Sequence, residues 1–327
     1  SSQVGAITTA AVTSLVTADI AALSTNALGG LTTAQIKALA TNQVVALTTN
    51  QAGALSTQQV ASLSTDAIVA LETADFAALK TAAVAGLSTN QIRALTTDQI
   101  VALTTAGANA LTTAQVSNLS TDAIAAMQTA DVAALKTSAI ASLSSTQVAA
   151  LTTDQIKGLT TASLVALSTA NIANGLTTDQ IVALSSSQFG SLSTAQIGAL
   201  STNSIAAIET ADIAGISPAG IAALQSSQIA GITTDQVAAL STNQVAALTS
   251  AGVSSLSTDQ VVALTSNQVA ALSTQQVAAF GTNAIAALET ADFAALKTAA
   301  IAALSSNQIR ALTTDQIVAL TTNEANA

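Results

Sequence analysis

The sequence contains no cysteine, histidine, tryptophan or tyrosine, and it has one proline and four phenylalanines in 327 residues. Without histidine and cysteine, the common catalytic triads and dyads and the usual zinc sites cannot form. We therefore expect no enzyme, and no catalytic, cofactor-binding or metal-binding residue. The lack of cysteine suits both a reducing cytosol and a bacterial exterior, so it leaves the compartment open.

Charged residues and long apolar runs are also scarce. Lys and Arg number 7 and Asp and Glu 17, so 7% of the chain is charged, against about a quarter in ordinary globular proteins. The net charge of −10 argues against nucleic acid as a partner, because nucleic-acid binding needs a basic surface. A polar residue returns within every eight residues, so we expect no membrane span.

What the chain has instead is an eight-residue unit, typified by Leu-Thr-Thr-Asp-Gln-Ile-Val-Ala at residues 95–102. With the unit numbered 1 to 8, position 1 is Leu, Ile, Met or Phe in steps of eight from Ile7 to Leu320, with one residue inserted near 174–175. One such octad is too small to bury a core and must pack on its neighbours. The period predicts a single continuous repeat solenoid over residues 1–327.

Each octad carries the signals of a helix start. Position 2 is usually Ser or Thr, which are preferred N-caps, and position 5 is most often Gln, which completes a capping box as in Thr96 and Gln99. Pro218, the only proline, falls on position 3, the first helical residue, where proline is favoured. Positions 1 and 6 form the accompanying hydrophobic staple, as in the pairs Leu95 and Ile100, Leu151 and Ile156, and Leu176 and Ile181.

These signals predict an all-α fold, a superhelical rod made of very short capped helices. One continuous helix is disfavoured, because eight residues at about 100° each would leave a drift of roughly 80° per repeat and would spread the leucines around it. Helices of about six residues are unstable alone, so we expect positions 1, 6 and 8 to pack inward across neighbouring octads. The alternative is a β-solenoid, which the abundant Thr, Val and Ile favour, although positions 1 and 6 have opposite parity and glycine does not recur at turns.

A variant octad with Thr-Ala-Asp at positions 3 to 5 overlies the small period. Successive variants are separated by seven octads, seven, ten plus the inserted residue, and ten. This spacing predicts growth by internal duplication. The variant octads begin at Leu15, Leu71, Met127, Ile208 and Leu288.

Most of the few basic residues lie near these variant octads, which suggests that charge pairs fix the stacking register. The plainer interpretation is solvated surface charge, worth under about 1 kcal/mol per pair. The hypothesis requires contacts within about 4 Å. The candidate pairs are Glu72 and Lys80, Glu289 and Lys297, Asp19 and Lys37, Asp75 and Arg93, and Asp292 and Arg310.

Acidic residues also recur at position 4, in the first helical turn, where a carboxylate complements the helix dipole. A ladder of such acids is also compatible with weak Ca²⁺ binding, although the chain has no specific cofactor motif. We favour the dipole role for these residues, which include Asp98, Asp154, Asp179 and Asp235.

The abundance of Ala, Thr, Ser, Gln and Asn, with few Lys and Arg and no Cys, resembles repetitive bacterial surface proteins such as S-layer proteins and large adhesins. The resemblance is one of composition and transfers no residue role. It implies a structural protein outside a bacterial cell: a self-assembling fibre, sheath or layer subunit, or an adhesin stalk. Ser1 enters in mid-octad and the octad from Leu320 has only Ala325 at position 6, so neither end predicts a cap. Either the chain is a fragment of a longer array, or its open ends dock on one another or on flanking domains; we expect self-association, for which head-to-tail contacts are one arrangement.

Two other functions remain as alternatives. Ala- and Thr-rich repeats resemble helical antifreeze proteins in composition, and paired threonines at positions 2 and 3 would form ordered rows suited to ice. An intracellular α-solenoid scaffold would hold a partner in a groove, although the chain is poor in the aromatic and Arg residues that dominate such interfaces.

Overall fold

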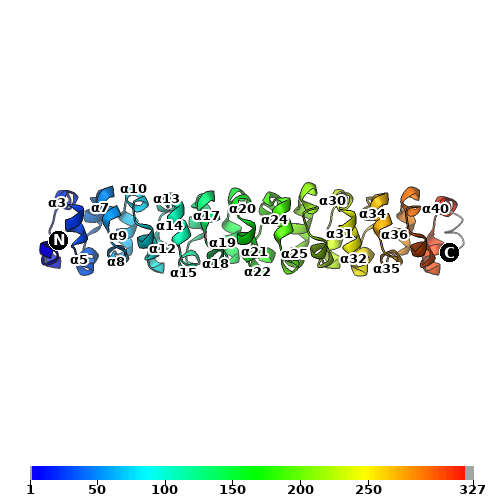
Figure 1. Ribbon diagram of the computed structural model, residues 1–327, viewed down its shortest axis with the longest axis horizontal. Coiled ribbons are helices and arrows are strands. Elements are labelled where there is room, and N and C mark those ends of the chain that lie inside the picture. The colour runs from blue at the N-terminus through cyan, green and yellow to red at the C-terminus, as the bar shows by residue number, and fades with distance from the viewer. Residues whose placement is uncertain (1, 321–327) are drawn as a thin grey trace. The chain divides into compact units, whose positions relative to one another are not determined.

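The computed structural model describes residues 2–320 (Figure 1). Within these residues all regular structure is helical, and each helix has four to six residues. The all-α prediction is therefore confirmed, and the β-solenoid alternative is wrong for the described part of the chain. The terminal residues behind the expected end-to-end contacts, Ser1 and 321–327, lie outside it.

The chain divides into two compact units, Ser1–Leu167 and Ser168–Ala327. The helices of the first unit are α1 (Ser2–Gly5), α2 (Thr9–Thr13), α3 (Thr17–Ala22), α4 (Thr25–Gly29), α5 (Thr33–Lys37), α6 (Thr41–Val45), α7 (Thr49–Ala54), α8 (Thr57–Ser62), α9 (Thr65–Ala70), α10 (Thr73–Ala77), α11 (Thr81–Ala85), α12 (Thr89–Ala94), α13 (Thr97–Val101), α14 (Thr105–Ala110), α15 (Thr113–Val116), α16 (Thr121–Ala126), α17 (Thr129–Ala134), α18 (Thr137–Ile140), α19 (Ser145–Ala150), α20 (Thr153–Gly158) and α21 (Thr161–Ala166).

The helices of the second unit are α22 (Thr169–Asn174), α23 (Thr178–Ala183), α24 (Ser186–Ser191), α25 (Thr194–Ala199), α26 (Thr202–Ala207), α27 (Thr210–Ile213), α28 (Pro218–Ala222), α29 (Ser226–Ala230), α30 (Thr234–Ala239), α31 (Thr242–Ala247), α32 (Ser250–Ser254), α33 (Thr258–Val262), α34 (Ser266–Ala271), α35 (Thr274–Ala278), α36 (Thr282–Ala287), α37 (Thr290–Phe293), α38 (Thr298–Ala302), α39 (Ser306–Ala311) and α40 (Thr314–Ala319).

From α2 on, each helix begins at position 3 of its octad, and in most octads the position-2 Ser or Thr caps it through its side chain. At α30, Thr233 is the N-cap with extended backbone angles, and its side chain accepts a hydrogen bond from the backbone N–H of Gln236. The helix ends at Ala239, and Leu240, position 1 of the next octad, is its C-cap. Two to four residues separate neighbouring helices, and no described residue adopts a positive φ. Pro218 lies at N1 of α28, as predicted.

Within each unit, from α2 on, each helix packs on the helix three places further along the chain, for example α5 on α8 and α31 on α34. Three octads therefore make one turn of the solenoid, and successive turns stack (Figure 1). Close approach between turns is visible at Gly215, where an added Cβ would lie 2.3 Å from the carbonyl oxygen of Ser186.

Positions 1 and 6 form the core, as expected. Leu151 and Ile156 are buried, as are Leu176 and Ile181, whereas Leu95 is half-buried beside the buried Ile100. Position 8 differs from the prediction, because its alanines are mostly half-buried. The place that we assigned to position 8 is taken by position 5, whose glutamines are buried.

Candidate functional site

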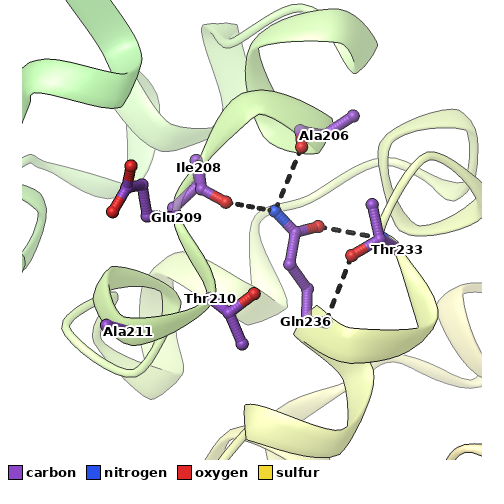
Figure 2. Close-up of a pocket in the computed structure, with 7 residues that line it drawn as sticks. All are labelled: Ala206, Ile208, Glu209, Thr210, Ala211, Thr233 and Gln236. Carbon is purple, nitrogen blue, oxygen red and sulfur yellow. Dashed lines mark hydrogen bonds between the residues drawn. The ribbon is translucent and has the colours of Figure 1, made fainter.

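The buried glutamine at position 5 joins two turns of the solenoid, and Gln236 illustrates how (Figure 2). Its Oε1 accepts a hydrogen bond from the backbone N–H of Thr233 at 2.9 Å, which closes the capping box of α30. Its Nε2 donates to the main-chain carbonyls of Ile205 at 3.0 Å and Ile208 at 2.6 Å. One side-chain amide therefore caps its own helix and ties it to the C-terminal end of α26, in the preceding turn.

The same geometry recurs along both units. Nε2 donates to the carbonyls 31 and 28 residues earlier, which belong to positions 6 and 1 of earlier octads; Gln228 differs slightly by reaching the carbonyls 30 and 28 residues earlier. We call these side chains the glutamine ladder. Its members within each unit include Gln35, Gln43, Gln51, Gln59, Gln91, Gln99, Gln115, Gln147, Gln155, Gln228, Gln236, Gln244, Gln260, Gln268, Gln276, Gln308 and Gln316.

The ladder solves a problem that very short helices create. The last carbonyls of any helix lack intrahelical partners, and in helices of four to six residues these groups are a large share of the backbone. Leaving a buried polar group without a partner costs about 1–3 kcal/mol, whereas a satisfied hydrogen bond contributes about 1 kcal/mol. Each ladder glutamine supplies donors to two carbonyls at such a helix end, and the position-6 carbonyl also accepts the N–H of the next position-1 residue. The solenoid is therefore held together by side chain–backbone bonds as well as by its apolar core.

Sequence reasoning identified the capping box but missed this bond between turns. A capping box accepts Glu as readily as Gln, because only the acceptor oxygen is used. No described octad has Glu at position 5. That preference for the amide was the available signal, since only the amide carries N–H donors.

The Thr-Ala-Asp octads replace the amide with a carboxylate. Asp75 accepts a hydrogen bond from the hydroxyl of Thr49 at 2.8 Å, and Asp131 accepts one from Thr105 at 2.8 Å. Asp212 and Asp292 receive equivalent bonds at 2.5 Å from Ser186 and Ser266. A carboxylate has no donor for the carbonyls that a glutamine would meet.

Asp131 is the most constrained of these acids. It is 2% exposed, and its Oδ2 has no hydrogen-bond partner. Burial raises the pKa of its carboxyl above the ordinary value, because desolvation disfavours the charged form, and the hydrogen bond from Thr105 lowers the pKa in part.

The hypothesis of register-fixing charge pairs is wrong. The structure records no salt bridge between the candidate partners, all of which lie in the described part of the chain. The reason is geometric: inter-turn contacts join residues about 25 to 31 positions apart, and the proposed partners are 8 or 18 apart.

The basic side chains bind the preceding or following turn instead. Lys80 donates to the carbonyl of Ala54 at 3.1 Å and Lys297 to that of Leu272 at 3.2 Å, at helix C-terminal ends where a cation is favourable. Arg93 donates to the side chain of Asn118.

The position-4 acids lie where the dipole argument places them. Asp98, Asp154, Asp179 and Asp235 are all in the first turn of their helices and exposed. Among the described residues, no group of three or more acidic side chains is arranged to hold a metal ion. None of the helices in the same part of the chain is long and apolar enough to cross a membrane.

Pockets of this chain that lie within one unit are open to solvent, as three examples show. One of about 500 Å³ lies between α27 and α30 and is lined by Ala206, Ile208, Glu209, Thr210, Ala211, Thr233 and Gln236 (Figure 2). Both ends of the Gln236 amide are already bonded to the backbone, and Glu209 points away from that amide (Figure 2). The polar groups of this pocket therefore serve the ladder.

The repeat itself decides the family. The model of the ALTTAQ repeat matches residues 14–49, 33–65, 68–105, 93–121, 124–161, 174–202, 205–242, 242–274 and 285–322, well over half of the chain. The chain belongs to the ALTTAQ repeat family. Residues 110–115 spell the Ala-Leu-Thr-Thr-Ala-Gln sequence itself, which runs from position 8 to position 5 of the next octad. The last letter of the ALTTAQ repeat is thus the ladder glutamine, here Gln115.

Two further comparisons add little to the ALTTAQ assignment. None of the curated proteins matches the sequence significantly. Among solved structures, the leucine-rich repeat-containing protein LegL7 from Legionella pneumophila is similar at 12% identity over 80% of this chain and 78% of that one, with a TM-score of 0.14. A likeness at that level carries no argument about fold or function.

Proposed function

We propose that this ALTTAQ repeat protein is a structural component outside a bacterial cell, a stalk or a subunit of a fibre, sheath or surface layer. The observation that carries the proposal is the glutamine ladder. Its amides are bonded to the chain's own backbone on both sides, so the recurring polar chemistry of the repeat serves cohesion between turns. Such a stack extends by adding units without any change in its local contacts.

The exposed surface supports the same role. Positions 2, 3 and 4 are exposed and carry mostly Ser, Thr, Ala, Asn and Asp. Small polar residues keep a long surface hydrated without the aromatic and Arg side chains that dominate protein-binding hot spots. With 7 Lys and Arg in the chain, proteases that cut after basic residues have few targets. These properties suit a spacer at a cell surface better than a scaffold whose groove grips a partner.

Electron microscopy of the purified chain over a range of concentrations, with and without Ca²⁺, tests the proposal. Filaments or sheets would support a self-assembling subunit, and isolated elongated particles would support a stalk. Compact monomers at every concentration, together with tight binding of a soluble small molecule, would overturn both. Labelling of intact cells of the source with a membrane-impermeant reagent tests the location, and protein protected from the label until lysis would refute it.

A second candidate is ice binding, favoured by the exposed threonines at position 3 on successive turns, such as Thr234 and Thr258. The position-2 hydroxyls count less, because they accept hydrogen bonds from the backbone as N-caps. Thermal hysteresis of a dilute solution decides this alternative. A protein that leaves ice growth unchanged at millimolar concentration has no ice-binding role.

A further inference from the structure

The glutamine ladder is interrupted for one complete turn at a time. Every described Thr-Ala-Asp octad that has a preceding turn lies between two octads with Ala, Gly or Ser at position 5. Because three octads make one turn, these three octads together form a complete turn without glutamine at position 5. We call these segments the glutamine-free turns. Their position-5 residues are Ala67, Asp75 and Ala83 in turn 63–86; Ala123, Asp131 and Ala139 in turn 119–142; Ser204, Asp212 and Gly220 in turn 200–223; and Ala284, Asp292 and Ala300 in turn 280–303.

The contrast with an ordinary turn is large. Gln260, Gln268 and Gln276 belong to one turn, and each places two Nε2 hydrogen bonds of 2.6 to 3.0 Å on the preceding turn. In turn 63–86, the corresponding side-chain bonds are the one from Thr49 to Asp75 and the one from Lys80 to Ala54. At Gly107 and Gly252 a single octad lacks the glutamine, and the octads on both sides of it keep theirs.

The apolar core continues through the glutamine-free turns. Ile68, Phe76 and Val84, at position 6 of turn 63–86, are all buried, and so are the position-1 residues Leu63 and Leu71. These turns are therefore folded and packed like the others. What they lose are the paired Nε2 hydrogen bonds that each ladder glutamine places on the preceding turn, while isolated side-chain bonds, such as that of Thr49 with Asp75, remain.

From these contacts we infer that the glutamine-free turns are built-in planes of weakness, at which each unit separates into blocks that unfold independently. In a solenoid, stability is approximately the sum of each repeat and its interface with the next, so an interface with fewer bonds opens first. The planes lie before residues 63 and 119 in the first unit and before 200 and 280 in the second. They bound a block of seven octads, 63–118, and one of ten octads, 200–279.

Such planes would let each unit unfold one block at a time. Under tension or heating, one block would unfold while its neighbours keep their ladder intact, and the opened block could refold on the surviving stack. This inference concerns the fold alone and holds wherever the protein is located, so its failure would leave the proposed structural role standing.

Hydrogen exchange of the full chain tests the inference directly. Amides of turn 63–86 should be protected at least about tenfold less than those of the ladder turn 31–54 in the same unit. Installing the missing amides with Ala67→Gln, Asp75→Gln and Ala83→Gln should raise that protection by at least about tenfold, because the added amides reach the same carbonyl positions. The matched control is Asp66→Gln, Ala74→Gln and Ala82→Gln, one position earlier and exposed, which should change nothing.

Forced unfolding of single molecules provides a second readout that does not depend on the triple variant folding. Release of block 63–118 should lengthen the chain by about 190 Å, and release of block 200–279 by about 270 Å. Equal protection in turns 31–54 and 63–86 would overturn the inference. So would unfolding of a whole unit in one event, or its loss turn by turn.

Discussion

At the scale of the residue, the choice of Gln at position 5 is explained by having both an acceptor and donors in one side chain. Gln276 shows the arrangement: Oε1 accepts from the backbone N–H of Ser273, and Nε2 donates to the carbonyls of Val245 and Leu248. Glutamate would retain the first bond and lose the other two, while placing a charge in the interior. The neighbouring Gln275 lies at position 4 and is exposed, so the same side chain occurs in both environments within one octad.

Replacing Gln276 by Glu or by Ala should therefore destabilise the protein by about 2–3 kcal/mol, because two hydrogen bonds are lost and the carbonyl of Leu248 is left without a donor, while that of Val245 keeps the N–H of Leu248. Gln275→Ala should change stability by less than about 0.5 kcal/mol, since it is an exposed substitution. Urea unfolding followed by circular dichroism measures both. Equal effects at the two positions would show that the ladder bonds contribute nothing to stability.

The buried carboxyl of Asp131 predicts a pH dependence of the opposite sign to that of a salt-bridged acid. Its pKa is raised by burial above the ordinary 3.8, so the folded state holds its proton more tightly than the unfolded state does. Stability from this group is thus full below about pH 3.8 and falls as the pH rises through the folded pKa. Asp131→Asn keeps the acceptor for Thr105 without the charge, and its stability relative to wild type should increase from pH 3 to pH 7 in urea titrations. A constant difference across that range would show that Asp131 ionises freely.

At the scale of the element, local chemistry was enough to place the helices. The cap at Thr233, the staple of Leu151 with Ile156 and the proline at N1 all depend on residues fewer than six positions apart, and each was predictable. The stacking interval was not, because a period of eight defines a helix but leaves the number of helices per turn open. That is why charge pairs 18 residues apart were a plausible but wrong guess, and why the reach of Gln236 to Ile205 was missed.

Because position 3 is N1, other octads should accept proline there as Pro218 does. Thr234→Pro should be neutral or stabilising by about 0.4–1 kcal/mol, since Thr234 is the first helical residue after an extended N-cap and proline restricts the unfolded state. Val237→Pro, three residues later in α30, removes the hydrogen bond from its N–H to the carbonyl of Thr233 and should cost about 3 kcal/mol or more. Thermal melts of the two variants compare them, and similar losses from both would contradict the assigned helix start.

At the scale of the whole molecule, the unit of tolerated change is the octad. Each octad of a ladder region meets an almost identical neighbour three places away, so removing one brings an equivalent partner into contact. Deletion of residues 264–271, one octad, should keep the helix content by circular dichroism and lower the melting temperature by no more than a few degrees. Deletion of 264–267, half an octad, puts later glutamines out of register with their carbonyls and should lower it much further. Equal losses would mean that the period is not what holds the stack in register.

The spacing of the Thr-Ala-Asp octads determines how equivalent surface sites are placed around the solenoid axis. Asp75 and Asp131 are separated by seven octads, and Asp212 and Asp292 by ten. Because three octads make one turn, seven octads are two whole turns plus one octad, and ten octads are three whole turns plus one octad. Corresponding side chains of consecutive blocks within a unit are therefore rotated about the solenoid axis by a third of a turn. A glycan, a ligand or a neighbouring molecule bound at equivalent sites of successive blocks would therefore lie at positions related by a rotation of a third of a turn about the solenoid axis. Three blocks built this way would present the same chemical group to every side.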